Sequence, residues 1–183
     1  MTKKIALVTG GVGFIGSHLV DLLLNHKYKV RVLDDLSGSN LKNLNHIKNK
    51  LNFKIFKKDI CNVSKKSTIF KNVDFVFHLA GKGDIVPSIE NPQTYINTNV
   101  LGTLNILEAS RYSKVKKIIY AASSSCYGLA VPPTNENAKI QLEHPYALSK
   151  YMGEEIAMSW HKIYGLPVNS IRIFNAYGKR YKT

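Results

Sequence analysis

A glycine run near the start of the chain constrains the fold more than any other feature. The apolar stretch from Ile5 to Thr9 leads directly into Gly10-x-x-Gly13-x-x-Gly16, and residues with helical spacing follow. This arrangement is typical of a dinucleotide-binding fingerprint, in which the glycines let the backbone turn tightly and approach a pyrophosphate. The helix that follows offers free N–H groups and the positive end of its dipole to the phosphates. The chain is therefore predicted to begin with the first strand and helix of a nucleotide-binding sheet.

Short apolar runs alternate with helical stretches along the rest of the chain, a pattern that indicates parallel strands joined by crossover helices. We expect strands at 5–9, 30–34, 53–56, 73–79, 117–122 and 168–174, and helices at 14–25, 92–110 and 146–164. The segments 37–50 and 129–143 are polar or contain proline, so they are expected to be irregular loops. The predicted fold class is α/β, with a doubly wound, mostly parallel sheet in one domain over residues 1–183.

The amino-acid composition limits which cellular compartment and which classes of partner are expected. The formal charge is +14, but the lysines are scattered through loops and strand edges, so an anionic small ligand is expected and no nucleic acid. No apolar run approaches the roughly 18 residues that span a bilayer, so no membrane partner is expected. Cys61 and Cys126 lie far apart and fit neither a zinc nor a disulfide pattern. A reducing cytoplasm and no metal site are therefore predicted.

An acidic residue stands where the second predicted strand ends. Asp34 follows Gly16 by 18 residues, near the spacing expected for a carboxylate that binds the adenosine ribose hydroxyls. A structural role in a strand-end turn is the alternative. Asp35 makes a 2′-phosphate unfavourable, and strand alternation points Arg31 away from Asp34. NAD is therefore favoured over NADP.

Tyr146 and Lys150 are four residues apart and share one face of a predicted helix. A phenol is a poor base at its reference pKa of about 10, and a nearby ammonium favours the phenolate. Most pairs with this spacing are only an exposed helix face. Here the pair comes after the glycine fingerprint and the serine run 123–125, and this order favours a catalytic base.

Seven motifs in order resemble those of the extended short-chain dehydrogenase/reductase family, in its nucleotide-sugar epimerase/dehydratase branch. They are Thr-Gly-x-x-Gly-x-x-Gly at 9–16, Asp-Ile at 59–60, His-Leu-Ala-Gly at 78–81, Asn-Val-Leu-Gly-Thr at 99–103, Ser-Ser-Ser-Cys-Tyr-Gly at 123–128, Tyr-x-x-x-Lys at 146–150 and Arg-Ile-Phe-Asn-Ala-Tyr-Gly at 172–178. The resemblance, which is strongest to the UDP-glucose 4-epimerase-like members, implies a Rossmann fold, NAD as cofactor and a homodimer formed through the helices around 92–110 and 146–164. It also implies a smaller C-terminal substrate lobe, which we expect to be absent from this chain.

The resemblance implies a role for each motif. Catalysis is assigned to Ser123, Tyr146 and Lys150, and substrate binding to Ser124, Ser125 and Asn175. The implied cofactor-binding residues are Gly10, Gly13, Phe14, Ile15, Gly16, Asp34, Asp35, Leu36, Ser37, Asp59, Ile60, Leu79, Ala80, Gly81, Asn99, Tyr146, Lys150 and Phe174. Alternatives stay open for two of them, since Asp59 is also suited to capping a turn and Asn99 to a polar helix face. His78 is interpreted as a core histidine.

The residues of the serine run 123–125 indicate which reaction of this branch is expected. Dehydratases of this branch carry Asp-Glu after the catalytic Thr, and the related decarboxylases usually keep a Glu at the position of Ser125. Ser124 and Ser125 therefore favour a 4-epimerase of a UDP-hexose, with Tyr146 as the base in a transient oxidation at C4 and Lys150 on the nicotinamide ribose. Another enzyme of the branch, such as a decarboxylase, dehydratase or reductase, stays open, and so does a catalytically silent NAD-binding fragment.

Overall fold

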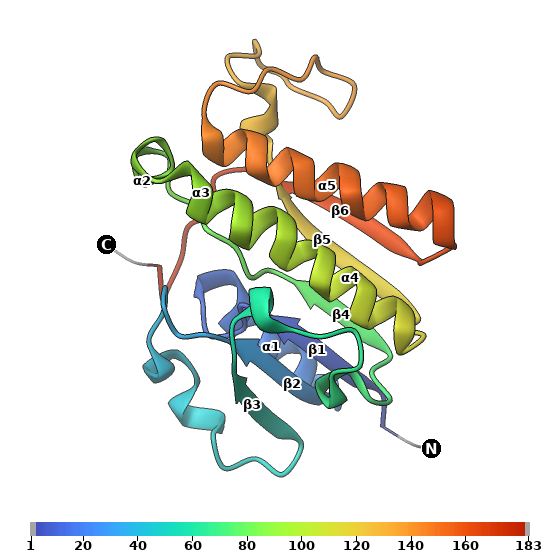
Figure 1. Ribbon diagram of the computed structural model, residues 1–183. Coiled ribbons are helices and arrows are strands. Elements are labelled where there is room, and N and C mark those ends of the chain that lie inside the picture. The colour runs from blue at the N-terminus through green and yellow to red at the C-terminus, as the bar shows by residue number, and fades with distance from the viewer. Residues whose placement is uncertain (1–2, 182–183) are drawn as a thin grey trace.

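The computed structural model describes residues 3–181, which form a six-stranded parallel sheet with helices on both faces (Figure 1). The strands are β1 (Ile5–Thr9), β2 (Lys29–Asp34), β3 (Phe53–Lys57), β4 (Phe75–His78), β5 (Lys117–Ser123) and β6 (Val168–Ile173). Their order is β3-β2-β1-β4-β5-β6, and each neighbouring pair is parallel. The predicted doubly wound α/β fold is therefore confirmed, and its order reverses between β1 and β4.

Two apolar cores lie on the two faces of the sheet. Successive strand residues point to opposite faces, so Ala6 and Val8 pack towards α1 (Phe14–Asn25), whereas Leu7 packs towards α4 (Thr103–Tyr112) and α5 (Pro145–Tyr164). In Figure 1, α4 and α5 run side by side across the near face and α1 lies behind the sheet. A sheet covered on both faces explains why its central strands are apolar almost throughout.

The long helix predicted at 92–110 is present as one continuous helical run over 92–112, but it contains a π-helical segment that the sequence did not predict. The run consists of α3 (Pro92–Tyr95), the π-helical segment η4 (Ile96–Gly102) and α4, and a separate short helix, α2 (Val86–Glu90), precedes it. In η4, Asn99 is buried, and a Cβ on Gly102 would lie 2.6 Å from the Ile60 side chain. These tertiary contacts stabilise the wider turn, and a local 3.6-residue pattern cannot register them.

The polar segment 37–50 is not fully irregular, contrary to the prediction. It contains the 3₁₀ segment η1 (Leu41–Ile47), whose N-cap Asn40 accepts a hydrogen bond from the Lys42 N–H at 3.0 Å. Leu44 and Ile47 are three residues apart and both are buried in the α1-side core. Three further 3₁₀ segments are η2 (Ile60–Asn62), η3 (Thr68–Phe70) and η5 (Ser124–Tyr127). The segment 129–143 has no helix, as expected.

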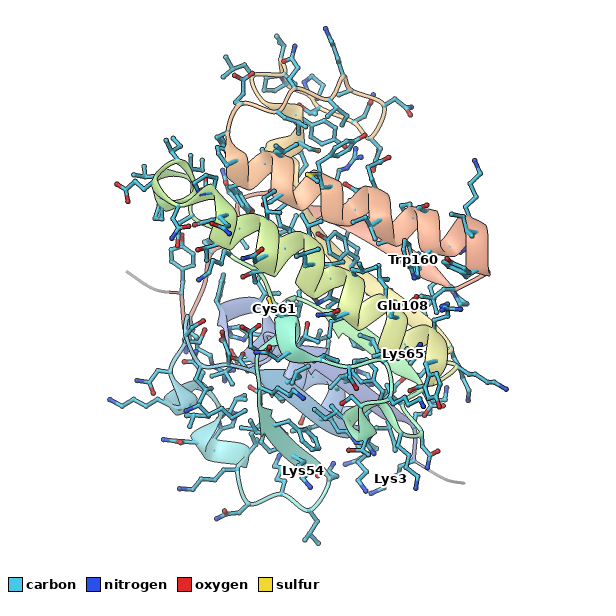
Figure 2. The ribbon with its side chains drawn as sticks, in the orientation of Figure 1. Lys3, Lys54, Cys61, Lys65, Glu108 and Trp160 are labelled. Atoms are coloured by element: carbon cyan, nitrogen blue, oxygen red, sulfur yellow. The ribbon has the colours of Figure 1, made fainter. Side chains whose placement is uncertain are left out.

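Figure 2 shows how α4 and α5 are joined and how the basic charge is distributed. The Trp160 indole Nε1 donates to Glu108 Oε1 at 2.7 Å, from α5 to α4. In Figure 2, Lys3 and Lys54 lie near one another at the lower end of the view, and Lys65 lies above them. Within residues 3–181, no helix is long and apolar enough to cross a membrane.

Candidate active site

A continuous cleft opens at the carboxyl ends of the parallel strands. This is the edge of a doubly wound sheet where ligands bind, at the point where the strand order reverses. The cleft has three connected parts. The inner hollow, of about 140 Å³, adjoins Asp34 and Asp59; the central hollow, of about 680 Å³, adjoins Lys150; and the outer hollow, of about 660 Å³, adjoins Ser124 and Ser125.

Shared walls connect the three hollows. Gly10, Gly81 and Lys82 line both the inner and the central hollow. Tyr146 and Phe174 line both the central and the outer hollow. An elongated ligand can therefore extend from the end of β2, past the glycine loop, to the end of β5.

The glycine loop has the shape that a pyrophosphate requires. Gly10 has a φ of +66°, and a Cβ there would lie 2.7 Å from the Ala80 backbone N. A Cβ on Gly16 would collide with the Gly10 carbonyl oxygen. No side chain caps α1 at Gly13, so the N–H groups of its first turn stay available at the edge of the cleft. This bare helix end fits a dinucleotide, as the fingerprint predicts.

Asp34 holds the glycine loop and lines the inner hollow. Its Oδ2 accepts from the Val12 N–H at 3.0 Å and its Oδ1 from the Leu36 N–H at 2.9 Å. Burial raises the pKa of this carboxyl, and the two backbone hydrogen bonds oppose that shift. Asp34 therefore does stabilise the turn at the end of β2, the structural role considered from the sequence. Its carboxylate also lines the inner hollow, where it can meet a ribose.

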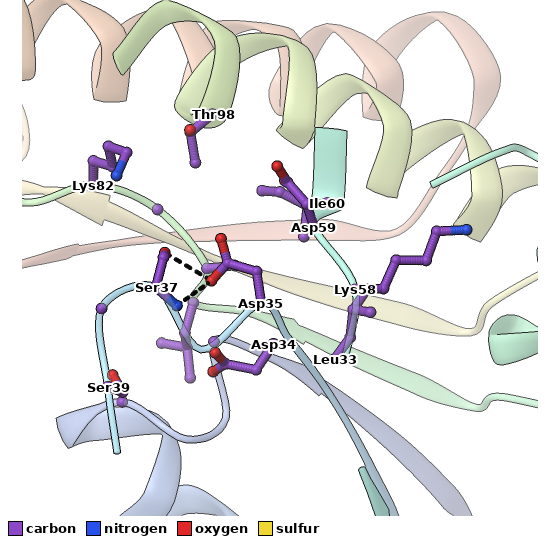
Figure 3. Close-up of a pocket in the computed structure, with 16 residues that line it drawn as sticks. Leu33, Asp34, Asp35, Ser37, Ser39, Lys58, Asp59, Ile60, Lys82 and Thr98 are labelled. Atoms are coloured by element: carbon purple, nitrogen blue, oxygen red, sulfur yellow. Dashed lines mark hydrogen bonds between the residues drawn. The ribbon is translucent and has the colours of Figure 1, made fainter. Parts of the chain in front are cut away.

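The charges around Asp34 fit an unphosphorylated ribose. Asp35 and Ser37 follow it along the inner hollow, and the Ser37 hydroxyl donates to Asp35 Oδ1 at 2.8 Å (Figure 3). Lys58 also lines this hollow, but its side chain extends away from Asp34 in Figure 3. The Arg31 guanidinium donates to the carbonyl oxygens of residues 69 and 71, so it points away from Asp34, as predicted. Two carboxylates at this end make a 2′-phosphate unfavourable.

Asp59 and Ile60 form the far wall of the inner hollow, as Figure 3 shows. Asp59 is also the N-cap of η2 and accepts from the Cys61 N–H at 2.8 Å. Asp59 therefore caps a turn, the alternative considered from the sequence, and also lines the cleft, as expected for a cofactor-binding residue. Leu36 is the predicted cofactor residue whose side chain packs with the α1-side core, and it contributes its N–H to Asp34.

Asn99 lies behind the cleft wall and positions it. Its Oδ1 accepts from the Lys82 N–H at 2.8 Å, and its Nδ2 donates to the Lys82 carbonyl oxygen at 3.0 Å and to Ser149 Oγ at 2.9 Å. Leu79, Ala80 and Gly81, which precede Lys82, line the inner hollow. The Asn99 amide is hydrogen-bonded both to the loop at Lys82 and to Ser149 of α5. It therefore fixes the distance between the cofactor-side wall and the helix that carries Tyr146.

The three residues assigned to catalysis meet in the central hollow. The Tyr146 hydroxyl donates to Ser123 Oγ at 3.1 Å. Lys150 is buried, and its Nζ donates to the Ala121 carbonyl oxygen and lies 4.7 Å from the Tyr120 ring centroid. Burial lowers the pKa of Lys150 to about 8, and Glu154 opposes the shift. Tyr146 and Lys150 line the same hollow, so the phenol and the ammonium face one ligand site.

Two aromatic residues that the sequence analysis missed hold Tyr146. The His144 ring stacks on the Tyr146 ring with centroids 5.8 Å apart and planes within 5°. Tyr95 contacts it edge-on at 6.4 Å. His144 is the N-cap of α5, and its Nδ1 accepts from the Ala147 N–H at 3.1 Å. The sequence did contain a signal for this helix start. His144 directly precedes Pro145, and proline is common in the first turn of a helix.

The outer hollow contains the residues expected to bind the substrate, Ser124, Ser125 and Asn175. Phe174 stands beside them, more than half exposed, with its ring stacked on Tyr127 at 6.3 Å. The same hollow contains Asp84, which the sequence analysis did not single out. Its only signal in the sequence was its place shortly after β4, where loops of this fold reach the cleft.

His78 is a buried core residue, as interpreted from the sequence. Its ring lies 2.7 Å from Thr9 Oγ1 and 3.0 Å from Thr103 Oγ1, and the Thr103 hydroxyl donates to the Asn99 carbonyl oxygen at 2.7 Å. Thr103 has one proton to donate, so His78 Nε2–H donates to Thr103 and Nδ1 accepts from Thr9. Burial, with Lys150 nearby, lowers the pKa of His78 to about 3, so the ring is neutral. Among residues 3–181, no cluster of histidine, cysteine and acidic side chains is suited to a metal ion.

Comparison with known proteins gives one consistent group. A family profile described as GDP-mannose 4,6 dehydratase matches residues 7–183. A UDP-glucuronate 4-epimerase of Thermodesulfobacterium geofontis is 37% identical over 94% of this chain and 56% of its own length. The solved UDP-N-acetylglucosamine 4-epimerase of Methanobrevibacter ruminantium, in complex with UDP-N-acetylmuramic acid, is 36% identical with a TM-score of 0.93, over 100% of this chain and 58% of that one.

A third relative was solved with a cofactor. The dTDP-glucose 4,6-dehydratase of Streptomyces venezuelae, with NAD bound, is 30% identical with a TM-score of 0.91, over 96% of this chain and 57% of its own. The chain thus spans a little more than half the length of the relatives that it matches.

Proposed function

The chain belongs to the GDP-mannose 4,6-dehydratase family, which includes nucleotide-sugar epimerases and dehydratases, and from this premise we propose that it serves the NAD-dependent 4-epimerisation of a UDP-hexose. The observation that carries the proposal is the meeting of Ser123, Tyr146 and Lys150 in one hollow, joined to a glycine loop suited to a dinucleotide. The glycine loop, Ser123 of β5 and the Tyr146/Lys150 pair of α5 come from three separate parts of the chain, so their shared cleft supports a catalytic role over an exposed Tyr/Lys pair.

The cleft residues fit NAD in this proposal. The first turn of α1 receives the pyrophosphate, Asp34 accepts hydrogen bonds from the adenosine ribose hydroxyls, and Lys150 faces the nicotinamide side. Asp59 and Ile60 enclose the adenine end, and Phe174 lies towards the nicotinamide end. When bound, NAD accepts the hydride from sugar C4 and returns it to the other face, so that no net oxidation occurs.

Tyr146 handles the proton in this scheme. Its phenolate takes the proton from the 4-hydroxyl of the sugar and gives it back after the 4-keto sugar has turned. Ser123 Oγ, at 3.1 Å, both donates and accepts, so it can bridge the sugar hydroxyl and Tyr146. Lys150 lines the same hollow as Tyr146. Asn99 keeps the helix in place through Ser149 Oγ, which donates to the Tyr146 carbonyl oxygen at 2.9 Å.

The residues near the sugar favour epimerisation over dehydration. Removal of water across two carbons uses an acid and a base beside the sugar, and the segment after Ser123 offers the hydroxyls of Ser124 and Ser125 in their place. Within the described part of the outer hollow, one carboxylate is present, that of Asp84. A dehydratase is the second candidate, because the family contains them and Asp84 supplies one of the two groups.

The experiment incubates the protein with NAD and UDP-glucose and follows the anomeric protons by NMR. UDP-galactose formation that Tyr146→Phe abolishes supports the proposal. A 4-keto-6-deoxy product would replace it with the dehydratase. NAD binding without conversion of UDP-glucose, UDP-N-acetylglucosamine or UDP-glucuronate would replace it with a catalytically silent NAD-binding module.

We further propose a cytoplasmic homodimer through η4, α4 and α5. Apolar side chains of this layer that are exposed in the described chain include Leu101, Tyr112, Leu148, Met152 and Ile163. Such exposure on neighbouring helices is typical of an interface. Both cysteines, Cys61 and Cys126, are free thiols, as in a reducing compartment. Sedimentation equilibrium tests the dimer, and a monomer at micromolar concentration would refute it.

A further inference from the structure

The outer hollow carries charge of one sign. Its lining consists of Gly83, Asp84, Ile85, Val86, Pro87, Ser123, Ser124, Ser125, Tyr146, Ile173, Phe174, Asn175 and Tyr181. Among these residues, which all belong to the described part of the chain, Asp84 alone is charged at neutral pH. A sugar in this hollow therefore meets hydroxyls, an amide, apolar walls and one carboxylate.

The loop that carries Asp84 is fixed at two points. Asn99 makes two hydrogen bonds to the backbone of Lys82. Beyond Asp84, the Ser88 hydroxyl donates to the Ile85 carbonyl oxygen and accepts from the Tyr146 N–H at 3.1 Å, which ties the loop to α5. These contacts keep Asp84 at a set place relative to Tyr146 and the serine run, so its charge acts on whatever sugar reaches them.

The cations of the cleft lie elsewhere. Lys82 and Lys150 line the central hollow, and the Lys150 ammonium is hydrogen-bonded to the Ala121 carbonyl oxygen. Neither lines the outer hollow. Asp84 also lines the central hollow with these lysines, so its repulsion would act on a sugar carboxylate held in the outer hollow, beside Ser124 and Ser125, where no described lining residue is a cation. A neutral hexose would instead offer hydroxyl donors, which a carboxylate accepts in charge-assisted hydrogen bonds.

We propose that Asp84 is a specificity-determining residue that selects uncharged hexoses and excludes uronic acids from the sugar site. The inference rests on the proposed function and narrows its substrate class. Overall similarity does not make this distinction, because the family contains both UDP-glucuronate and UDP-N-acetylglucosamine 4-epimerases. The distinction lies in the charge that this chain places beside Ser124 and Ser125.

The test measures binding, so it does not depend on turnover. Saturation-transfer NMR with NAD present gives the Kd of UDP-glucose and of UDP-glucuronate for the wild type, for Asp84→Asn and for Glu90→Gln. Asp84→Asn keeps the shape and removes the charge, whereas Glu90→Gln neutralises an exposed carboxylate of α2 that does not line the hollow. We expect UDP-glucose to bind about tenfold more tightly to the wild type, as one like-charge contact in a partly solvated site implies.

The possible results test the role of Asp84 in specificity separately from the proposed 4-epimerase function. The Kd ratio should fall towards one in Asp84→Asn, should persist in Glu90→Gln, and should shrink with added salt in the wild type. Equal affinities in the wild type, or a ratio that Asp84→Asn leaves unchanged, would overturn the inference and leave the proposed function standing. Binding of neither sugar nucleotide, with NAD still bound, would overturn both.

Discussion

The Tyr146 hydroxyl lies 3.1 Å from Ser123 Oγ, which joins the first turn of α5 to the end of β5. The two residues are 23 positions apart in the sequence, and only the crossover of the chain brings them together. The hydrogen bond orients the phenol towards the hollow that it shares with the glycine loop. In the proposed function, the same hydrogen bond provides the path by which the proton of the sugar 4-hydroxyl passes through Ser123 to Tyr146.

Tyr146→Phe should lower kcat by at least a hundredfold and leave the NAD affinity near that of the wild type, because the change removes the general base and keeps the ring. Ser123→Ala should lower kcat less, since Tyr146 can still reach the sugar hydroxyl. Steady-state kinetics and calorimetry with NAD check both. Wild-type turnover in Tyr146→Phe would remove Tyr146 from the mechanism.

Asp34→Ala should weaken NAD binding by roughly tenfold to a hundredfold, in line with the loss of hydrogen bonds to a charged group. It should also loosen the glycine loop, because the Val12 and Leu36 N–H groups lose their acceptor. Calorimetric titration with NAD is the measurement, with Glu90→Gln, outside the cleft, as control. An unchanged affinity would place the ribose elsewhere.

Lys150 should make stability depend on pH. Burial lowers the pKa of Lys150 from 10.5 to about 8, so between these values the unfolded chain binds more protons than the folded one. Stability from this group therefore rises with pH from about 8 towards 10.5, by roughly 3 kcal/mol in all. Urea unfolding at pH 8, 9 and 10 should show a steeper rise in the wild type than in Lys150→Met. Parallel pH profiles would contradict the buried ammonium.

His144 should combine two separable roles. As N-cap of α5 it accepts from the Ala147 N–H, and its ring stacks on Tyr146. His144→Ala should lower the free energy of unfolding by about 1 kcal/mol, and His144→Asn should recover most of it because asparagine is a good N-cap. Neither variant keeps the ring, so both should lower kcat with little change in KM. Full activity in His144→Asn would show that the stacking has no part in positioning the phenol.

His78 should stay neutral across the physiological range. Its pKa is lowered to about 3, and its two nitrogens have fixed partners in Thr9 and Thr103. Nitrogen-15 NMR should show the Nε2–H tautomer and no titration of this ring between pH 5 and 8. A titration in that range would mean that the ring reaches water.

The sheet and the cofactor end of the cleft could be predicted from the sequence because their signals are local. Strands β1, β2 and β5 appear as apolar runs, and Gly10, Gly16 and Asp34 stand at fixed spacings beside them. Parallel strands then bring their carboxyl ends to one edge, so the topology follows once the alternation of strands and helices is recognised. The resemblance to a family added the roles of residues such as Asp59 and Asn99.

Tertiary structure alone decided the rest. The π-helical turn of η4 depends on Asn99 reaching Lys82 and on Gly102 meeting Ile60, contacts between residues far apart in sequence. The same is true of Asp84, whose place in the outer hollow depends on the loop after β4, which Asn99 holds at Lys82 and Tyr146 holds at Ser88. Periodicity describes which face of an element a residue occupies, but not which distant element meets that face. Spacing in the chain therefore determined the nucleotide-binding scaffold, while packing between its elements decided which side chains line the outer hollow.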